Sequence, residues 1–182
     1  RLHEKDVLQF DFAQLKTDAN LLRIFGNLPY NISTPLIFHL IPYSRMIKDM
    51  LFMVQKEVAE RLAAQANDEH VGRLSIMVQY HFKVELLFDV PATAFEPPPK
   101  VESSIIKLIP HAELPCVAKD YNLFANIVRD AFGQRRKTLR NSLKNRVSDS
   151  LWDALSLRSD LRAENLSVYD FVMISNAITD AA

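Results

Sequence analysis

Short apolar runs alternate with helical segments over roughly the first 110 residues of this chain, and this alternation constrains its fold most. The runs Leu22–Phe25 and Met50–Val54 have turn residues nearby, a pattern typical of buried strands. Val84–Val90 and Ser103–Ile109 are further candidate strands, the second because its side chains alternate in character. Strands separated by helices predict an α/β layer on a mostly parallel sheet.

Helices are expected between these strands. Thr34–Leu40 has apolar residues at helical spacing, with Ser33 or Thr34 suited to the N-cap and Pro35 to the first helical position. Lys56–Gln65 is a second helix with a charged face, which indicates a side exposed to solvent.

The pattern changes further along the chain. Pro110, Pro115 and the short polar stretch between them form a candidate linker. From Tyr121 onward the apolar residues recur at helical spacing. We therefore expect an α/β domain over residues 1–112 and a small all-helical domain over residues 113–182.

Composition and charge narrow the class of protein. The 182 residues are 48% hydrophobic and 24% charged, which is typical of a globular protein. Lys+Arg and Asp+Glu number 22 each, so net charge indicates no nucleic-acid partner and such evidence has to be local. The single cysteine, Cys116, suits a reducing compartment. No apolar run approaches membrane-spanning length and no signal peptide opens the chain, so we expect a cytoplasmic protein without membrane contact.

The five residues from Gly26 to Tyr30 combine groups suited to holding an aromatic amine. An amine such as adenine N6 is a poor nucleophile because its lone pair is delocalised into the ring. The side-chain oxygen of Asn27 and the carbonyl of Leu28 can accept from its two N–H groups and favour a pyramidal nitrogen. Pro29 restricts the backbone on both sides of this position, and Tyr30 can stack on the base. Taken alone, these residues also suit an ordinary strand-to-loop turn.

Three blocks of the sequence resemble ribosomal RNA adenine N6-dimethyltransferases. Phe25–Pro35 (FGNLPYNISTP) is similar to the substrate-amine motif of that family, and Phe95–Ser103 (FEPPPKVES) to its second target-base motif. Phe132–Leu143 (FGQRRKTLRNSL) resembles the segment that links its helical domain. The bacterial small-subunit enzymes are the most similar members, including at Arg162–Ser167. The blocks occur in the family's order and span most of the chain.

The resemblance implies the remaining part of a Rossmann-like class I methyltransferase domain, followed by a small all-helical domain that recognises rRNA. The reaction would be dimethylation, by S-adenosylmethionine, of N6 in two adjacent adenosines near the 3′ end of small-subunit (16S) rRNA during ribosome biogenesis. The catalytic residues would be Asn27, Leu28, Pro29, Tyr30 and Phe95. Phe95 would cover the flipped base, since a base undergoing chemistry leaves its stack. The prolines after Phe95 suit a stiff segment that positions this ring or, alternatively, a polyproline ligand.

The resemblance also assigns a cofactor side to the site. Asp6 follows what the sequence indicates is the end of a short strand, and it would accept from the cofactor's adenine amine. Asn27 would lie beside the methionine portion of the cofactor. The family's glycine-rich cofactor loop would precede Arg1, and no two of the chain's three glycines are close in sequence. We therefore expect the chain to be the remainder of a longer protein.

A basic run extends from Arg129 to Arg146. It has seven basic residues against one acidic residue, Asp130, for a net charge of +6. A solvated helix face explains such a run as well as RNA does, although phosphate contacts supply much of RNA affinity. The family resemblance favours the rRNA backbone, and pairing of one of these residues with the methyltransferase domain is the alternative. The implied RNA-binding residues are Arg135, Arg136, Lys137 and Arg140.

Two other functions stay open. One is a non-catalytic rRNA-binding or ribosome-assembly module, and the other is methylation of large-subunit rRNA, against which the block Gln134–Leu143 argues by resemblance. The expected partner is 16S rRNA in an immature small subunit, bound by a monomer. The five histidines lack metal-ligand spacing, so no metal site is predicted. Trp152 lies among apolar residues at helical spacing and is expected in the core rather than on a base.

Overall fold

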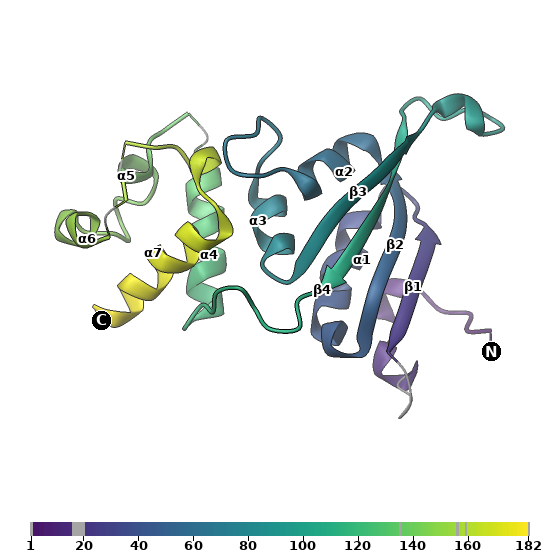
Figure 1. The fold of residues 1–182 in the computed structure, drawn as a ribbon, viewed down its shortest axis with the longest axis horizontal. Helices are drawn as coiled ribbons and strands as arrows, with labels where there is room; N and C mark the ends of the chain where they lie inside the picture. The colour runs from purple at the N-terminus through teal and green to yellow at the C-terminus, as the bar shows by residue number, and fades with distance from the viewer. Residues whose placement is uncertain (1, 16–20, 135, 156, 159, 182) are drawn as a thin grey trace. The chain divides into compact units, whose positions relative to one another are not determined.

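The computed structural model describes residues 2–15, 21–134, 136–155, 157–158 and 160–181. These residues form two compact units (Figure 1). The first unit comprises the described parts of residues 1–63 and 81–112, and the second those of 64–80 and 113–182. Residues 64–80 therefore group with helices that follow much later in the chain. The expected division into domains at residue 112 stays a prediction, since contacts alone do not show which segments fold together.

The first unit is built on a four-stranded sheet in the order β1-β2-β4-β3 (Figure 1). Four of the strands expected from the sequence are confirmed: β1 (Leu22–Asn27), β2 (Ile47–Gln55), β3 (Phe82–Val90) and β4 (Ser103–Pro110). Strands β1 and β2 are parallel, whereas β4 runs antiparallel to both β2 and β3. The prediction of a mostly parallel sheet is therefore wrong.

The chain reverses direction between β3 and β4, and no α-helix separates these two strands. The connection contains a 3₁₀ turn, Ala92–Ala94, and a proline-rich segment with a cis peptide bond between Glu96 and Pro97. Parallel neighbours need a crossover, usually through a helix, whereas antiparallel neighbours do not. Strand β4 can therefore return beside β3 and pair with β2 on its other side.

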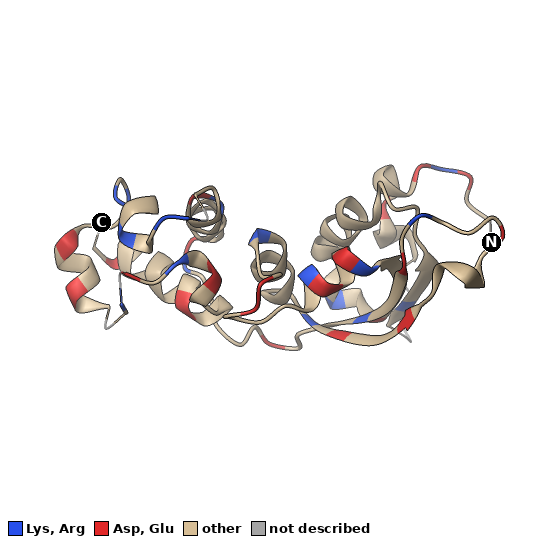
Figure 2. Cartoon of the chain, turned by 90° about the horizontal axis from the view of Figure 1, so that it is seen from above, with Lys and Arg blue, Asp and Glu red and all other residues tan. Residues whose placement is uncertain are grey.

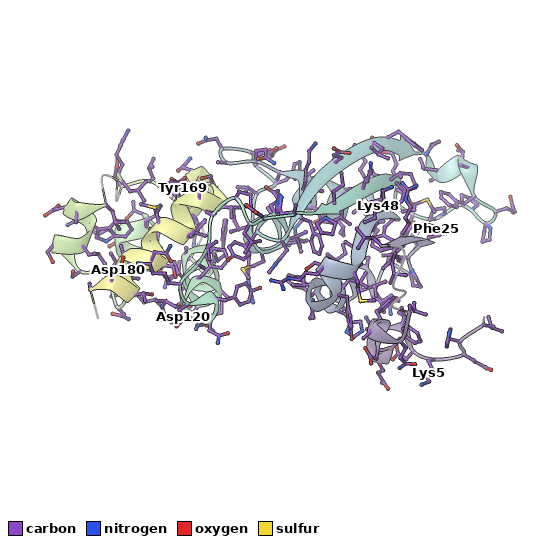
Figure 3. The ribbon with its side chains drawn as sticks, turned by 60° about the horizontal axis from the view of Figure 1, so that its bottom comes forward. Lys5, Phe25, Lys48, Asp120, Tyr169 and Asp180 are labelled. Atoms are coloured by element: carbon purple, nitrogen blue, oxygen red, sulfur yellow. The ribbon has the colours of Figure 1, made fainter. Side chains whose placement is uncertain are left out.

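One face of the sheet forms the core of this unit. Met50 and Phe52 of β2 pair with Leu108 and Ile106 of β4, and all four are at most 1% exposed. Successive side chains along a strand point to opposite faces. Phe25 of β1 lies on the other face with 82% of its surface exposed (Figure 3). This contrast fixes the strand register, because a slip of one residue would exchange the two faces.

Two α-helices belong to the same unit, α1 (Ser33–Leu40) and α2 (Lys56–Ala63). Both were expected, and both bury apolar residues on one side, namely Leu36, Ile37 and Leu40 in α1 and Ala59 and Leu62 in α2. Shorter 3₁₀ turns complete the unit at Val7–Gln9, Phe12–Leu15 and Ile41–Met46.

The start of α1 differs from the expected one. Ile32 is the N-cap residue and makes no side-chain cap, so Pro35 is the third rather than the first residue of the helix. The hydroxyl of Ser33 donates to the carbonyl of Tyr30 at 3.1 Å. The expected cap was wrong because this serine closes the preceding turn instead of capping the helix.

The described part of the second unit contains helices without strands. They are α3 (Arg73–Gln79), α4 (Tyr121–Phe132), α5 (Leu139–Ser142), α6 (Asp149–Ala154) and α7 (Val168–Asp180), with a 3₁₀ turn at Ala163–Asn165. Phe124 of α4 and Phe171 of α7 are fully buried, and Trp152 is 3% exposed, which confirms its expected place in the core. Among the described residues, no helix combines the length and apolar character needed to span a bilayer.

Candidate active site

The turn after β1 is held to the sheet by its backbone. The amide of Leu28 donates to the carbonyl of Met53 in β2 at 3.2 Å, and the amide of Ile32 donates to the carbonyl of Pro29 at 3.0 Å. The Leu28 side chain is buried, at 7% exposure. Asn27 ends the strand and is exposed. The turn therefore places Asn27 at the carboxyl end of a strand, the end at which open α/β sheets bind ligands.

Two acceptors of this turn are available to a ligand. No hydrogen bond from another described residue reaches the Asn27 carboxamide or the Leu28 carbonyl. The Leu28 amide and the Pro29 carbonyl, which lie on either side of the Leu28 carbonyl, are both hydrogen bonded, so the Leu28 carbonyl keeps a fixed direction. A side-chain oxygen and a backbone oxygen on adjacent residues can accept two hydrogen bonds from one amine.

Tyr30 is fixed at both ends. Its carbonyl accepts from Ser33, and its hydroxyl makes a 2.9 Å hydrogen bond with the hydroxyl of Ser103 at the start of β4. Ser103 is fully buried. No role was predicted for this serine, although it ends the Phe95–Ser103 block, because its partner lies 73 residues away. Ser103 therefore holds the Tyr30 ring, which belongs to the turn after β1, in place from β4.

A pocket of about 380 Å³ brings Phe95 to this turn. Phe95 follows the 3₁₀ turn Ala92–Ala94, and its amide donates to the carbonyl of Ala92. The lining residues are Asn27, Leu28, Pro29, Tyr30, Phe95, Glu96, Pro97 and Pro99. The five residues expected to be catalytic thus line one pocket, although Phe95 is far from the others in sequence.

An ion-pair cluster secures both ends of the connection that carries Phe95. The ammonium of Lys56 contacts Asp89 at 3.0 Å and Glu102 at 2.9 Å, and the hydroxyl of Ser104 donates to Asp89 at 2.6 Å. The hydrogen bonds and charges of Glu102 and Asp89 raise the pKa of Lys56 well above its ordinary value, so the lysine stays charged. Lys56 was expected only on a charged helix face, but from the start of α2 it joins the end of β3 to the residue just before β4.

Asp6 lies apart from this pocket lining. It caps the 3₁₀ turn Val7–Gln9, where its carboxylate accepts from the Leu8 amide at 2.9 Å and the Gln9 side chain at 3.4 Å. The strand expected before Asp6 is wrong, because residues 2–5 do not pair with a described strand. The turn Val7–Gln9 that follows packs on α1, and His39 Nε2 of α1 lies 2.8 Å from the carbonyl oxygen of Phe10. The Asp6 carboxylate remains exposed and retains acceptor lone pairs.

Three of the four residues expected to bind RNA lie in the second unit, called the helical unit below, and the fourth lies outside the described residues. Arg136 and Lys137 are exposed after α4, and Arg140 of α5 pairs with Asp149 at 3.0 Å. Arg135 lies outside the described residues. Figure 2 shows acidic as well as basic positions in this unit, so the basic run does not make the unit uniformly positive. The described residues contain no group of three or more His, Cys, Asp or Glu placed to hold a metal ion.

Solved structures with this arrangement define the class of protein. A dimethyladenosine transferase from Plasmodium falciparum superposes with a TM-score of 0.74 and 28% identity, over 94% of this chain and 70% of that one. The 23S rRNA methyltransferase ErmE shares the fold, with a TM-score of 0.68 and 18% identity over 93% of this chain and 70% of its own. The first unit thus has the α/β fold of Rossmann-like methyltransferases, as expected from the sequence.

The family follows from sequence comparison. The family model described as ribosomal RNA adenine dimethylase matches residues 1–180. A ribosomal RNA small subunit methyltransferase A from Chromohalobacter salexigens is 56% identical over 185 residues, covering 100% of this chain and 66% of the relative. One from Pseudomonas aeruginosa is 53% identical over 179 residues, covering 98% and 67%. The chain belongs to the ribosomal RNA adenine dimethylase family, and it spans about two thirds of the length of these relatives.

Proposed function

We propose that this chain carries the target-base half of the active site of a methyltransferase. Its reaction would be the S-adenosylmethionine-dependent dimethylation of N6 in two adjacent adenosines near the 3′ end of small-subunit rRNA. The observation that carries the proposal is the pocket in which two available acceptors, of Asn27 and Leu28, meet the rings of Tyr30 and Phe95. Membership of the family and the names of the relatives support the choice of rRNA and of the small subunit.

The residues of the turn act on the adenine amine. Asn27 accepts one N–H through its side-chain oxygen, and the Leu28 carbonyl accepts the other. Two acceptors on one side favour a pyramidal nitrogen whose lone pair points away from the turn. Most of the rate enhancement then comes from holding this nitrogen in line with its electrophile. No general base is required, because the N6 proton becomes acidic only after the methyl group has been transferred.

The two rings hold the base in place. Tyr30 stacks on one face of the adenine, and its orientation is fixed by the bond to Ser103. Phe95 covers the opposite face or edge from the β3–β4 connection. Stacking of a base on an aromatic side chain contributes about 1–3 kcal/mol and offsets part of the energy needed to remove the base from its stack.

Asp6 and Asn27 fit the cofactor side of the site. The exposed Asp6 carboxylate can accept from an adenine amine, and Asn27 lies at the carboxyl end of β1. S-adenosylmethionine supplies, when bound, the electrophilic methyl group. The chemistry of these donors and acceptors needs no metal ion. We further propose that the protein acts as a monomer in the cytoplasm, on immature small subunits.

Product analysis tests this function directly. The protein expressed from its complete gene is incubated with immature small subunits and labelled methyl donor, and the digested rRNA is analysed by mass spectrometry. We expect dimethyladenosine at two adjacent positions near the 3′ end of the small-subunit rRNA. Methylation of large-subunit rRNA instead would support the alternative substrate. Tight binding to small subunits without methyl transfer would identify a non-catalytic assembly module.

A further inference from the structure

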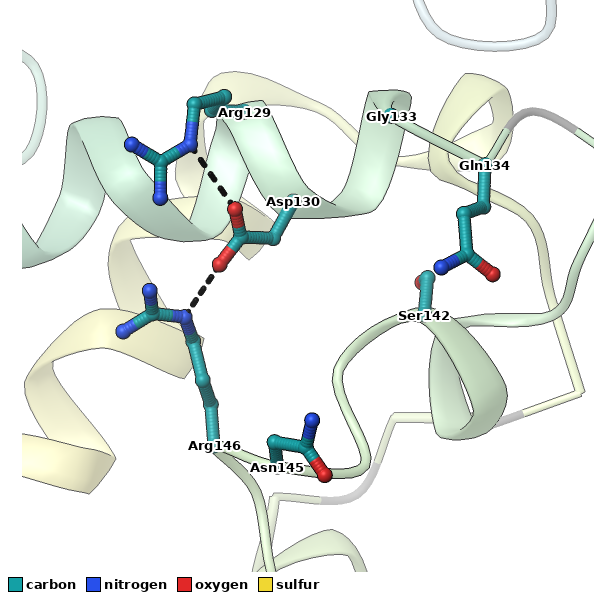
Figure 4. Close-up of a pocket in the computed structure, with 7 residues that line it drawn as sticks. All are labelled: Arg129, Asp130, Gly133, Gln134, Ser142, Asn145 and Arg146. Atoms are coloured by element: carbon teal, nitrogen blue, oxygen red, sulfur yellow. Dashed lines mark hydrogen bonds and ion pairs between the residues drawn. The ribbon is translucent and has the colours of Figure 1, made fainter.

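A second pocket, of about 630 Å³, lies within the helical unit (Figure 4). The end of α4, the start of the following segment, α5 and the stretch after α5 contribute to it. Its lining residues are Arg129, Asp130, Gly133, Gln134, Ser142, Asn145 and Arg146. The blocks Phe25–Pro35 and Phe95–Ser103, which line the pocket at the Asn27–Tyr30 turn (the base pocket), contribute no residue to it, so it requires an explanation of its own.

One carboxylate organises the two arginines of this pocket. Asp130 accepts from Nε of Arg129 at 2.9 Å through one oxygen and from Nε of Arg146 at 2.5 Å through the other. An arginine has five N–H donors, so each guanidinium keeps four on its terminal amino groups. No described residue is recorded as a partner of these groups. Figure 4 shows them on the same side of the Asp130 carboxylate.

The charges of the cluster favour a monoanionic ligand. Partial burial by itself would raise the pKa of Asp130, but the hydrogen bonds from Arg146 and Arg129 outweigh it, so the pKa is lowered and the carboxylate stays ionised. Two guanidiniums and one carboxylate leave a formal charge of +1. A phosphodiester carries one negative charge and presents two oxygens to planar, forked donors. Its binding would make the pocket formally neutral.

The remaining lining is polar, with side-chain amides from Gln134 and Asn145. Figure 4 shows Gln134 across the Asp130 carboxylate from the terminal amino groups of the two arginines, so the phosphate site consists of the guanidiniums. The hydroxyl of Ser142 donates to the Leu139 carbonyl at 3.3 Å. The described residues that line the pocket include no aromatic ring, which sets it apart from the pocket that holds Phe95 and Tyr30.

We propose that the Arg129–Asp130–Arg146 pocket binds one backbone phosphodiester of the rRNA substrate. The proposal rests on the proposed function, because it takes RNA to be the partner. Asp130 is a positioning residue: it holds the two guanidiniums side by side, so that their forked donors meet one phosphate. The competing explanation is a structural tether, in which Arg146 only fastens the segment after α5 to α4.

Salt-dependent binding tests the proposal. Affinity of the full-length gene product for immature small subunits is measured over a range of KCl concentrations. We expect Arg129→Gln and Arg146→Gln each to weaken binding roughly threefold to tenfold, and to lower the slope of log K against log salt by about 0.7–0.9, the effect of one phosphate. The double variant should lose no more slope than either single variant, because both arginines contact the same phosphate.

A matched control is available in the same unit. Arg158 is an exposed arginine that pairs with Asp160 through two hydrogen bonds, at 3.1 and 2.6 Å, outside the pocket. Arg158→Gln should leave both affinity and slope unchanged.

The outcomes separate this site from the proposed function. A folded Arg129→Gln variant with unchanged affinity and slope overturns the phosphate site. This variant is decisive because Arg129 pairs with its own neighbour in α4 and tethers no other segment. A lower unfolding temperature for Arg146→Gln, with normal RNA binding by both variants, identifies the tether. If the wild-type protein itself fails to bind small subunits, the proposed function fails and this site with it.

Discussion

The pocket at the Asn27–Tyr30 turn and the Arg129–Asp130–Arg146 pocket are built from opposite kinds of groups. The first offers the uncharged oxygens of Asn27 and Leu28 and two aromatic rings, with Glu96 as the one charged residue of its described lining. The second offers guanidiniums held by a carboxylate. Uncharged acceptors suit a flat base whose amine donates, and paired cations suit a phosphate. The contrast suggests that the chain separates recognition of the reacting base from recognition of the RNA backbone.

The two pockets also differ in how their residues are held. In the first, the turn is held by a backbone hydrogen bond to β2 and by the Tyr30–Ser103 bond, and ion pairs of Lys56 lie only at the ends of the connection that carries Phe95. In the second, the arginines that face the ligand are themselves held by ion pairs with Asp130. Salt screens exposed charges but acts little on hydrogen bonds between uncharged groups. Substitutions in the first pocket should therefore change the methyl-transfer rate and leave the salt dependence of RNA binding unchanged. Substitutions in the basic run Arg129–Arg146 should change the salt dependence and leave the rate unchanged.

Asn27→Ala should have the largest effect. We expect the methyl-transfer rate in saturated complexes to fall by about 10²- to 10³-fold, the usual loss for one oriented hydrogen-bonding group at a reacting centre. Affinity for small subunits and its salt slope should stay unchanged, because no charge is removed. Single-turnover transfer from labelled S-adenosylmethionine measures the rate.

Asn31→Ala is the matched control for that experiment. Asn31 is an exposed asparagine close to the same turn, but it does not line the pocket. The methyl-transfer rate of the Asn31→Ala variant should equal that of the wild type. Equal losses in both variants would show that the turn, rather than the Asn27 carboxamide, was disturbed.

Phe95→Ala should have the next largest effect. Loss of a stacked ring costs about 1–3 kcal/mol, so the rate should fall roughly 5- to 150-fold. Phe95→Tyr should retain most of the rate, because it keeps the ring. Phe88→Ala removes a phenylalanine of β3 that is 58% exposed, and it should leave the rate unchanged. A Phe95→Ala enzyme of normal rate would remove this ring from the base pocket.

Arg136 and Lys137 test the other side of the contrast. Both are exposed after α4. Replacing both with glutamine should weaken binding to small subunits roughly tenfold and lower the salt slope by about 0.7–0.9 for each phosphate contact that is lost. The single-turnover rate at saturation should not change. A lower rate with an unchanged slope would assign these residues to chemistry and contradict the separation of roles.

The sequence predicted the local parts of this site better than its long-range contacts. The strands and the residues of the base pocket were expected, because apolar runs and motif blocks are local patterns. The direction of β4 was not, because an alternation of strands and helices gives no signal for a connection that lacks a helix. Lys56 was expected on a solvated face, since its partners Asp89 and Glu102 are distant in sequence.

The Arg129–Asp130–Arg146 pocket shows the same difference between local patterns and long-range contacts. From the sequence, Asp130 was counted only as one negative charge within a run of positive ones. The structure shows that this carboxylate sets the positions of Arg129 and Arg146. Charge counting finds a basic segment, but the pairing of one acid with two bases depends on how the segment after α5 folds back on α4.

The Tyr30–Ser103 hydrogen bond should have the smallest effect, and it sharpens the account of the base pocket most. Tyr30→Phe keeps the ring but loses the hydroxyl, and Ser103→Ala loses its partner. A hydrogen bond of this kind contributes about 0.5–1.5 kcal/mol, so each variant should lower the methyl-transfer rate roughly 2- to 12-fold. If the bond acts by holding the ring, the double variant should be no slower than either single one, because the same interaction is lost only once. Multiplying effects would instead mean that the two hydroxyls act separately, and that the tyrosine ring is positioned by the turn alone.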